Sequence, residues 1–159
     1  MNSKRPRLLV VWHGALIPEY RKPFEYLHRS AFEVTLLVPD RWRQALTGEQ
    51  QYVPGESESF HTYVEKVRLP DYAVLHSYPQ LHRILHETSP EIVLAIEEPY
   101  SLITARLLRW CRKRGIPFAF HTYQDLDKRY PPPFCWAQRY VLRKSDLALV
   151  ANSTVEQVL

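Results

Sequence analysis

The stretch Ile92-Val-Leu-Ala-Ile96-Glu97-Glu98-Pro99 is the clearest indication of how this chain folds. A short apolar run ends abruptly in polar residues, and a helix-like pattern follows. The same arrangement recurs at Ile116–Phe120, before His121-Thr122, and at Leu147–Ala151, before Asn152-Ser153. Apolar runs of this length without alternation are typical of parallel strands buried on both faces. The alternation of strand and helix therefore predicts an α/β fold with a Rossmann-like, doubly wound parallel sheet.

The rest of the chain continues this alternation, with one irregular connection. Further strands are predicted at Arg7–Trp12, Val34–Val38 and Phe60–Leu69, and helices at Pro18–Arg29, Gln80–Glu87, from Pro99 to a stop at Gly115, and Phe134–Lys144. A last helix is predicted to begin at Ser153, because Ser153 and Glu156 have capping-box spacing. Residues Arg41–Ser59, rich in Gln, Glu, Ser, Pro and Gly, predict an irregular, mobile connection.

Composition predicts one globular domain over residues 1–159, since 45% of the residues are hydrophobic and 24% are charged. The net charge of +4 favours acidic partners such as phosphates or an anionic membrane surface. No nucleic-acid-binding motif occurs, so no nucleic-acid partner is expected. Two cysteines are too few for a disulfide framework, and no apolar run approaches about 20 residues. The predicted location is cytoplasmic.

The candidate site lies where the predicted strands end. In open parallel sheets, ligands bind just beyond the carboxyl ends of the strands. The residues that the sequence places along this rim are Gly14, Glu97, Glu98, His121, Thr122 and Asn152. Adjacent side chains on an extended backbone point in opposite directions, so Glu97 and Glu98 do not form a ready-made acid–base pair.

Each of these residues also has an ordinary structural interpretation. Gly14 suits a close approach of the backbone to a phosphate, and it equally suits a simple tight turn. The two carboxylates fit a structural ion pair as well as a site, and His121 fits a core histidine. Arg21 and Lys22, on the first helix near the rim, suit contact with an anionic acceptor or membrane, or a solvated helix face.

Several enzyme classes are disfavoured by missing motifs. The chain contains neither Gly-x-Gly-x-x-Gly nor a P-loop, which argues against a dehydrogenase and excludes a P-loop enzyme. His82 and His86 have helical spacing, but Arg83 stands where a zinc protease needs glutamate, so no metal site is expected. No Gly-x-Ser-x-Gly elbow occurs, which disfavours a covalent hydrolase.

Three segments, Pro90–Ser101, Arg114–Thr122 and Lys144–Ser153, resemble the N-terminal half of a family 4 retaining glycosyltransferase with the GT-B fold. The resemblance implies the acceptor-side domain of an enzyme that moves a sugar from a nucleotide-sugar to a glycan or lipid-linked acceptor without a metal. It also implies a partner, either a C-terminal donor-binding domain or a separate donor-domain chain, and an inactive chain without it.

The same resemblance implies roles for the rim residues. His121 would be catalytic and orient the transferred sugar, and Gly14 would lie near the donor diphosphate. Glu97, Glu98, Thr122 and Asn152 would bind substrate in the same cleft. One departure is that many members carry paired glycines after the first strand, where this chain has Gly14 followed by alanine.

Two other hypotheses remain open from the sequence. The chain could be a non-catalytic binding subunit of a split glycosyltransferase, or an unrelated Rossmann-like ligand-binding domain. A lipid-linked or otherwise anionic acceptor would place the protein at the inner face of the membrane, where its basic surface would meet anionic headgroups.

Overall fold

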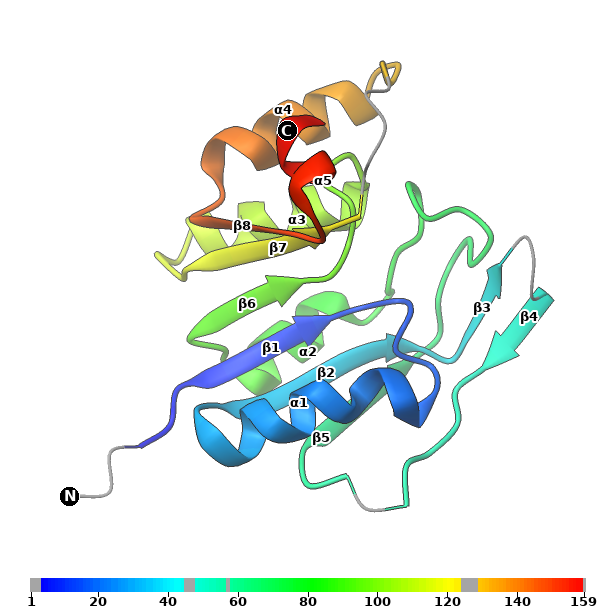
Figure 1. Cartoon of the computed structure of the whole chain (residues 1–159), viewed down its shortest axis with the longest axis vertical. Helices are drawn as coiled ribbons and strands as arrows, with labels where there is room; N and C mark the ends of the chain where they lie inside the picture. The colour runs from blue at the N-terminus through cyan, green and yellow to red at the C-terminus, as the bar shows by residue number, and fades with distance from the viewer. Residues whose placement is uncertain (1–3, 45–47, 57, 124–128, 159) are drawn as a thin grey trace.

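A six-stranded parallel sheet forms the centre of the molecule in a computed structural model that describes residues 4–44, 48–56, 58–123 and 129–158. Its strand order is β5-β2-β1-β6-β7-β8 (Figure 1). The strands of this sheet are β1 (Arg7–Val11), β2 (Glu33–Pro39), β5 (His61–Glu65), β6 (Ile92–Ala95), β7 (Phe118–Thr122) and β8 (Leu147–Val150). The helices are α1 (Pro18–Ser30), α2 (Leu81–Thr88), α3 (Leu102–Arg112), α4 (Phe134–Lys144) and α5 (Ser153–Val158).

The strand order makes the sheet doubly wound. The chain runs outward from β1 through β2 to β5, and then returns to place β6 on the other side of β1. Leu8 of β1 is therefore in register with both Val34 of β2 and Ile92 of β6. The predicted Rossmann-like α/β fold is confirmed. In the described part of the chain, no helix combines the length and apolarity needed to cross a membrane.

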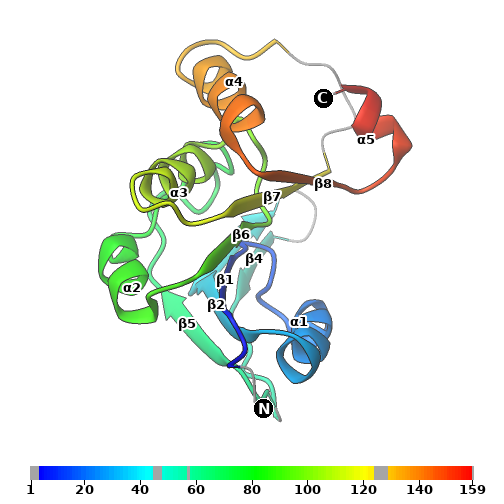
Figure 2. The ribbon, with the colours of Figure 1, turned by 90° about the vertical axis from the view of Figure 1, so that its left-hand side faces the viewer.

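Helices cover both faces of the sheet (Figure 2). Helices α2, α3 and α4 lie on one face, and α1 and α5 lie on the other. Alternate residues of β1 serve the two layers, because successive side chains of a strand point to opposite faces. Leu8 and Val10 pack in the cluster that includes Phe24 of α1, whereas Leu9 and Val11 join the cluster of α2 and α3. Each such fully buried side chain stabilises the fold by about 1.5–3 kcal/mol.

The connection after β2 differs from the prediction. Part of the segment Arg41–Ser59 forms an antiparallel hairpin of β3 (Arg41–Gln44) and β4 (Gly48–Gln51) instead of an irregular connection. Trp42 is 4% exposed and belongs to the core cluster of α2 and α3. Burial of this indole by residues distant in sequence holds the hairpin, which local composition could not indicate.

Two helix starts also refine the predictions. Helix α3 begins at Leu102 and not at Pro99, because Ser101 remains extended and donates its hydroxyl to the carbonyl of Ala73 at 3.0 Å. Helix α5 begins at Ser153 as predicted, but Asn152 caps it by accepting a hydrogen bond from the Val155 amide at 3.0 Å. Helix α4 has the predicted bounds.

Arg21 lies inside the fold, although the sequence suggested contact with an acceptor or a membrane. Its side chain is 1% exposed and donates to the carbonyls of Ala15 at 2.9 Å and Val53 at 2.7 Å. Its Nε also pairs with Glu58, and its guanidinium lies 4.7 Å from the centre of the Tyr52 ring. Arg21 therefore ties α1 to the segment before β5, and of the two residues only Lys22 is exposed.

We expect Arg21→Met to lower the free energy of unfolding by about 3 kcal/mol, because it removes one partner of a largely buried network. Lys22→Met changes the neighbouring exposed residue and should alter that free energy by less than about 0.5 kcal/mol. Urea unfolding of both variants measures the difference. Equal effects of the two substitutions would contradict a structural role for Arg21.

Candidate functional site

A pocket of about 530 Å³ lies at the carboxyl ends of β1, β6 and β7. This is the place where a doubly wound sheet reverses its strand order, and open α/β sheets bind ligands there. Its size falls within the range of small-molecule sites. The residues that line it are Trp12, His13, Gly14, Tyr20, Ala73, Ile96, Glu97, Glu98, His121 and Tyr123. We call it the rim pocket.

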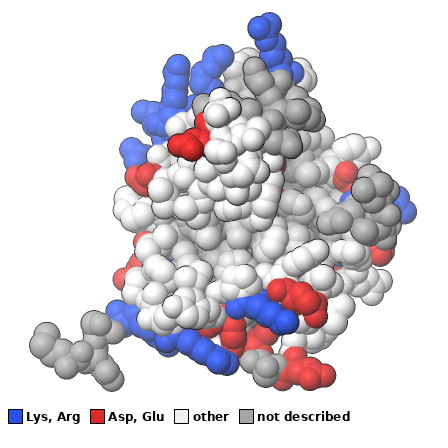
Figure 3. All heavy atoms as spheres, in the orientation of Figure 1, with Lys and Arg blue, Asp and Glu red and all other residues white. Residues whose placement is uncertain are grey.

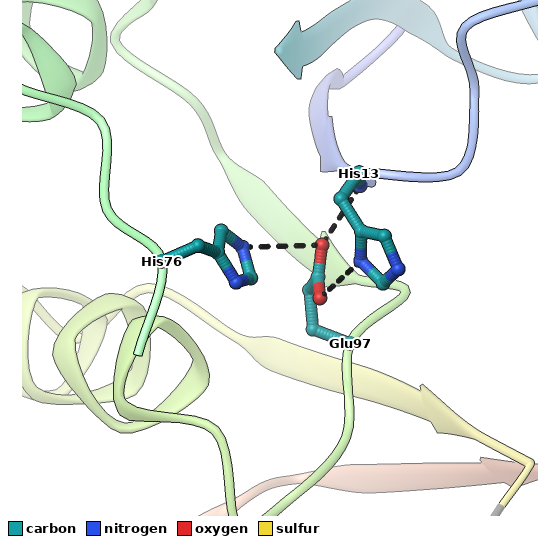
Figure 4. Close-up of side chains that lie close together, drawn as sticks. All are labelled: His13, His76 and Glu97. Carbon is teal, nitrogen blue, oxygen red and sulfur yellow. Dashed lines mark hydrogen bonds and ion pairs between the residues drawn. The ribbon is translucent and has the colours of Figure 1, made fainter. Parts of the chain in front are cut away.

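The centre of the rim pocket is a pair of hydrogen bonds between His13 and Glu97. The His13 backbone amide donates to Oε1 of Glu97 at 2.8 Å, and its Nδ1 lies 2.7 Å from Oε2 (Figure 4). Because a carboxylate can only accept, Nδ1 carries the proton. The other ring nitrogen, Nε2, lies on the side of the ring away from Glu97. The His13 ring also packs against Trp42, with 4.3 Å between ring centres.

Burial and charge act in opposite directions on this pair. Burial alone would lower the pKa of His13, but attraction to the Glu97 carboxylate, the hydrogen bond to it and the nearby charge of Glu98 together raise that pKa above 6.5. Burial alone would raise the pKa of Glu97, but the two imidazoles of His13 and His76 and the hydrogen bonds from His13 hold it below 4.5. Each residue therefore stabilises the charged form of the other.

His76 approaches the same carboxylate from the other side. Its Nδ1 bonds to the Ala73 carbonyl at 2.8 Å, which leaves Nε2 facing Oε1 of Glu97 at 3.7 Å (Figure 4). That distance is too long for a hydrogen bond, and Nε2 has no hydrogen-bond partner among the described residues. Burial and the charge of His13 lower the pKa of His76, although Glu97 opposes them. Glu97 thus stands between two imidazoles whose pKa values are shifted in opposite directions.

The three residues also offer a set of possible metal ligands. One ligand atom from each of His13, His76 and Glu97 lies within 4.8 Å of the others. Two atoms bound to one tetrahedral zinc ion would be about 3.3 Å apart, given zinc–ligand distances of about 2.0–2.1 Å. Nδ1 of His13 and Oε2 of Glu97 are 2.7 Å apart, which is a hydrogen-bond distance. The geometry therefore favours a histidine–carboxylate pair over a metal centre, and a metal-free site stays a prediction.

Glu98 bonds to residues other than the partners of Glu97. Its carboxylate accepts from the Thr122 hydroxyl and from the Tyr123 amide, the latter at 3.2 Å. Burial raises the pKa of Glu98, with a smaller contribution from the charge of Glu97, while the two hydrogen bonds oppose the change. Thr122 therefore stands behind Glu98 and holds it at the edge of the rim pocket.

His121 lies on the far wall of the rim pocket. Its ring meets the Tyr123 ring edge to face at 4.5 Å, and its buried Nδ1 has no hydrogen-bond partner in the described part of the chain. Burial lowers the pKa of His121, so the neutral imidazole prevails at neutral pH. His121 is thus a neutral donor or acceptor beside the charged His13–Glu97 pair.

The structure brings together four of the six predicted rim residues: Gly14, Glu97, Glu98 and His121. A Cβ at Gly14 would lie 2.7 Å from the Trp12 indole nitrogen, so glycine lets this ring fold back over the turn. Asn152 is exposed, caps α5 and lies outside the rim pocket.

Sequence reasoning missed the two histidines that flank Glu97. His13 directly follows the first predicted strand, so its place at the rim was available from the same rule that indicated Gly14. His76 lies in an irregular segment between β5 and α2, and no periodicity marks it. Only the tertiary structure brings His76 to Glu97.

Comparison with known proteins yields fold-level likenesses only. No family model matches the chain, and neither does the sequence of any curated protein. Similar solved structures include an epimerase from the methanogen Methanothermobacter thermautotrophicus, with a TM-score of 0.49 and 13% identity over 86% of this chain. Another is an isochorismatase-like hydrolase from Alkaliphilus metalliredigens, with a TM-score of 0.46 and 11% identity over 96% of this chain. The chain covers 45% of the epimerase and 95% of the hydrolase.

These findings overturn the glycosyltransferase prediction. Both structures are from other classes of protein, and no glycosyltransferase family model matches. The family assignment, the GT-B half and the sugar-transfer activity were therefore wrong. Two of the segments that suggested them contain β6 and β7, which are largely buried strands with polar ends, as any doubly wound α/β sheet requires. The third contains β8, which was predicted to be buried but is an edge strand with Leu147 54% exposed. At such low identities and TM-scores, neither similar protein lends its activity to this chain.

The pairing of His13 with Glu97 predicts a pH-dependent stability. The raised pKa of His13 contributes stability that is present below pH 6.5 and lost as pH rises through that pKa. The lowered pKa of Glu97 contributes stability that is present above pH 4.5 and lost as pH falls through that pKa. Glu97→Gln should therefore lower the free energy of unfolding by about 1.5–3 kcal/mol between pH 4.5 and pH 6.5, and by less at higher pH.

Urea unfolding across this pH range tests the prediction, with Glu49→Gln as a control on an exposed strand. In parallel, NMR titration of the His13 ring should show that its pKa falls in Glu97→Gln, because burial is then opposed only by the charge of Glu98. An unchanged His13 pKa in that variant would contradict the assigned pairing.

Proposed function

We propose that this chain is an acid–base enzyme that acts on a small molecule carrying hydroxyl or carbonyl oxygens, with His13 as the group that transfers the proton. The observation that carries the proposal is the 2.7 Å contact of His13 Nδ1 with the buried carboxylate of Glu97. That contact fixes the tautomer and leaves Nε2 as the proton acceptor on the side away from Glu97.

The proposed proton transfer follows from this arrangement. Neutral His13 takes a proton from the bound molecule through Nε2 and returns it to the product. Glu97 accepts the hydrogen bond from Nδ1–H throughout and stabilises the imidazolium that forms. The raised pKa of His13 strengthens the imidazole as a proton acceptor, because Glu97 stabilises the imidazolium that the transfer forms.

The walls of the rim pocket support the choice of ligand. Trp12, Tyr20 and Tyr123 offer aromatic surface, and Trp12 and Tyr20 lie with ring centres 5.8 Å apart. Glu98 supplies a hydrogen-bond acceptor, and neutral His121 supplies a donor or an acceptor. Aromatic faces with a few polar groups are typical of sites for small organic molecules.

The cytoplasmic location and the peripheral position at the inner face of the membrane remain part of the proposal. The net charge of +4 supports attraction to anionic headgroups, and Lys22 is the exposed member of the pair first suggested for such contact.

The test is hydrogen–deuterium exchange into candidate ligands. Aldoses, ketoses and 2-keto acids that bind, detected by a shift of the Trp12 indole resonance, are incubated with the protein in D₂O. The carbon beside the carbonyl group should gain deuterium. His13→Gln should slow this gain about 100-fold or more, because a positioned acid–base group contributes about 10²–10⁴-fold.

His121→Gln is the matched control, since it removes the other imidazole of the same pocket. We expect it to retain exchange within about tenfold. Loss of exchange in His121→Gln but not in His13→Gln would assign proton transfer to His121 instead. Binding without exchange for every ligand that binds, or no binding across the set, would contradict the proposed enzyme.

A further inference from the structure

A second concave site lies between α2 and α3, in the helix layer opposite α1. Its volume is about 440 Å³, and none of the residues that line it belongs to the rim pocket. The lining residues are Leu81, His82 and Leu85 of α2, with Arg106, Arg109, Trp110, Lys113 and Arg114 from α3 and its C-terminal turn. No carboxylate is among them. We call it the helix groove.

The cations of the helix groove have no acidic partner in the part of the chain that the structure describes. Arg106, Arg109, Lys113 and Arg114 are exposed, and within the described residues none of them has a carboxylate oxygen within 4.0 Å. Neighbouring arginines behave differently. Arg83 of α2 pairs with Glu65 at 3.2 Å and Glu87 at 3.4 Å, and Arg112 of α3 pairs with Asp146 at 3.9 Å. Positive charge without internal compensation is therefore concentrated in one concavity.

Figure 3 shows where Lys and Arg side chains gather on the surface. A group of Lys and Arg side chains projects from the upper left edge, where Figure 1 places the ends of α3 and α4. The spacing of Arg106, Arg109 and Lys113 by three and four residues places these side chains on one face of α3.

The helix groove has an apolar floor, and one of its lining residues carries an unused hydrogen-bond donor. Leu81 and Leu85 are buried, and the Arg114 guanidinium lies 4.4 Å from the centre of the Trp110 ring. The indole N–H of Trp110 is buried and has no hydrogen-bond partner among the described residues. A buried donor without a partner is unusual in a folded protein, and a bound acceptor would satisfy it.

We propose that the helix groove binds a small, soluble organic phosphate. Arginine forks and a lysine ammonium match phosphate oxygens in charge and hydrogen-bonding geometry. The leucine floor covers the organic part of such a ligand, and the volume suits a small molecule. Because the helix groove shares no residue with the rim pocket, this inference does not depend on the proposed acid–base activity.

The probes are phenyl phosphate and inorganic phosphate, titrated while the Trp110 indole resonance is followed by NMR. That resonance is assigned by its absence in Trp110→Phe. Phenyl phosphate should shift it saturably and bind more tightly than inorganic phosphate, since only the former reaches the apolar floor. The combined variant Arg106→Gln, Arg109→Gln and Lys113→Gln should weaken phenyl phosphate binding at least tenfold.

The matched control is Arg139→Gln, Arg143→Gln and Lys144→Gln on α4, which removes the same charge from exposed positions outside the helix groove. It should bind phenyl phosphate within about threefold of the parent chain. An equal loss in both variants would attribute binding to net charge and overturn the proposal. Absence of phenyl phosphate binding would also overturn the proposal, and this includes the case where anionic phospholipid vesicles bind through the same residues.

Discussion

The pair of hydrogen bonds between His13 and Glu97 is the interaction on which the rim of this fold depends. The two residues are 84 positions apart, yet they follow strands β1 and β6, which are neighbours in the sheet. A buried carboxylate is costly unless it is paired and hydrogen-bonded, and the backbone amide and ring of His13 meet both needs. The same carboxylate faces His76, whose Nδ1 bonds to the Ala73 carbonyl, and the His13 ring packs on Trp42 of the hairpin. Glu97 thus links the turn after β1 to the segment that carries His76, and the His13 ring extends this contact to the hairpin.

The two concave sites arise from different layers of the architecture. The rim pocket is a consequence of strand order, because the loops after β1 and β6 diverge to opposite faces of the sheet and leave a crevice between them. His13 and Glu97 are hydrogen-bonded to each other there, whereas Nδ1 of His121 has no hydrogen-bond partner among the described residues. The helix groove belongs to the outer layer, where two helices present exposed cations over apolar side chains. The paired polar groups of the rim pocket suit chemistry on a neutral oxygen-bearing molecule. The uncompensated positive charge of the helix groove suits an anion.

The resemblance to a glycosyltransferase failed for a physical reason that concerns all open α/β sheets. Two of its supporting segments contain β6 and β7, whose apolar composition is required by burial between two layers of helices, and the third contains the more exposed edge strand β8. The polar residues after each strand mark the point at which the chain leaves the core in any such sheet. A pattern dictated by burial identifies the fold and carries little information about the reaction, because the reaction depends on which side chains meet across loops.

The sequence by itself determined the strands, the helices and the edge of the sheet where the site lies, since these follow from local periodicity and from the rule that ligands meet strand ends. The tertiary structure alone decided that Trp42 would fix a hairpin, that Arg21 would be buried, and that Asn152 would cap a helix away from the pocket. It also decided that His76 would reach Glu97. These features depend on contacts between residues far apart in the chain, and local sequence patterns do not contain that information.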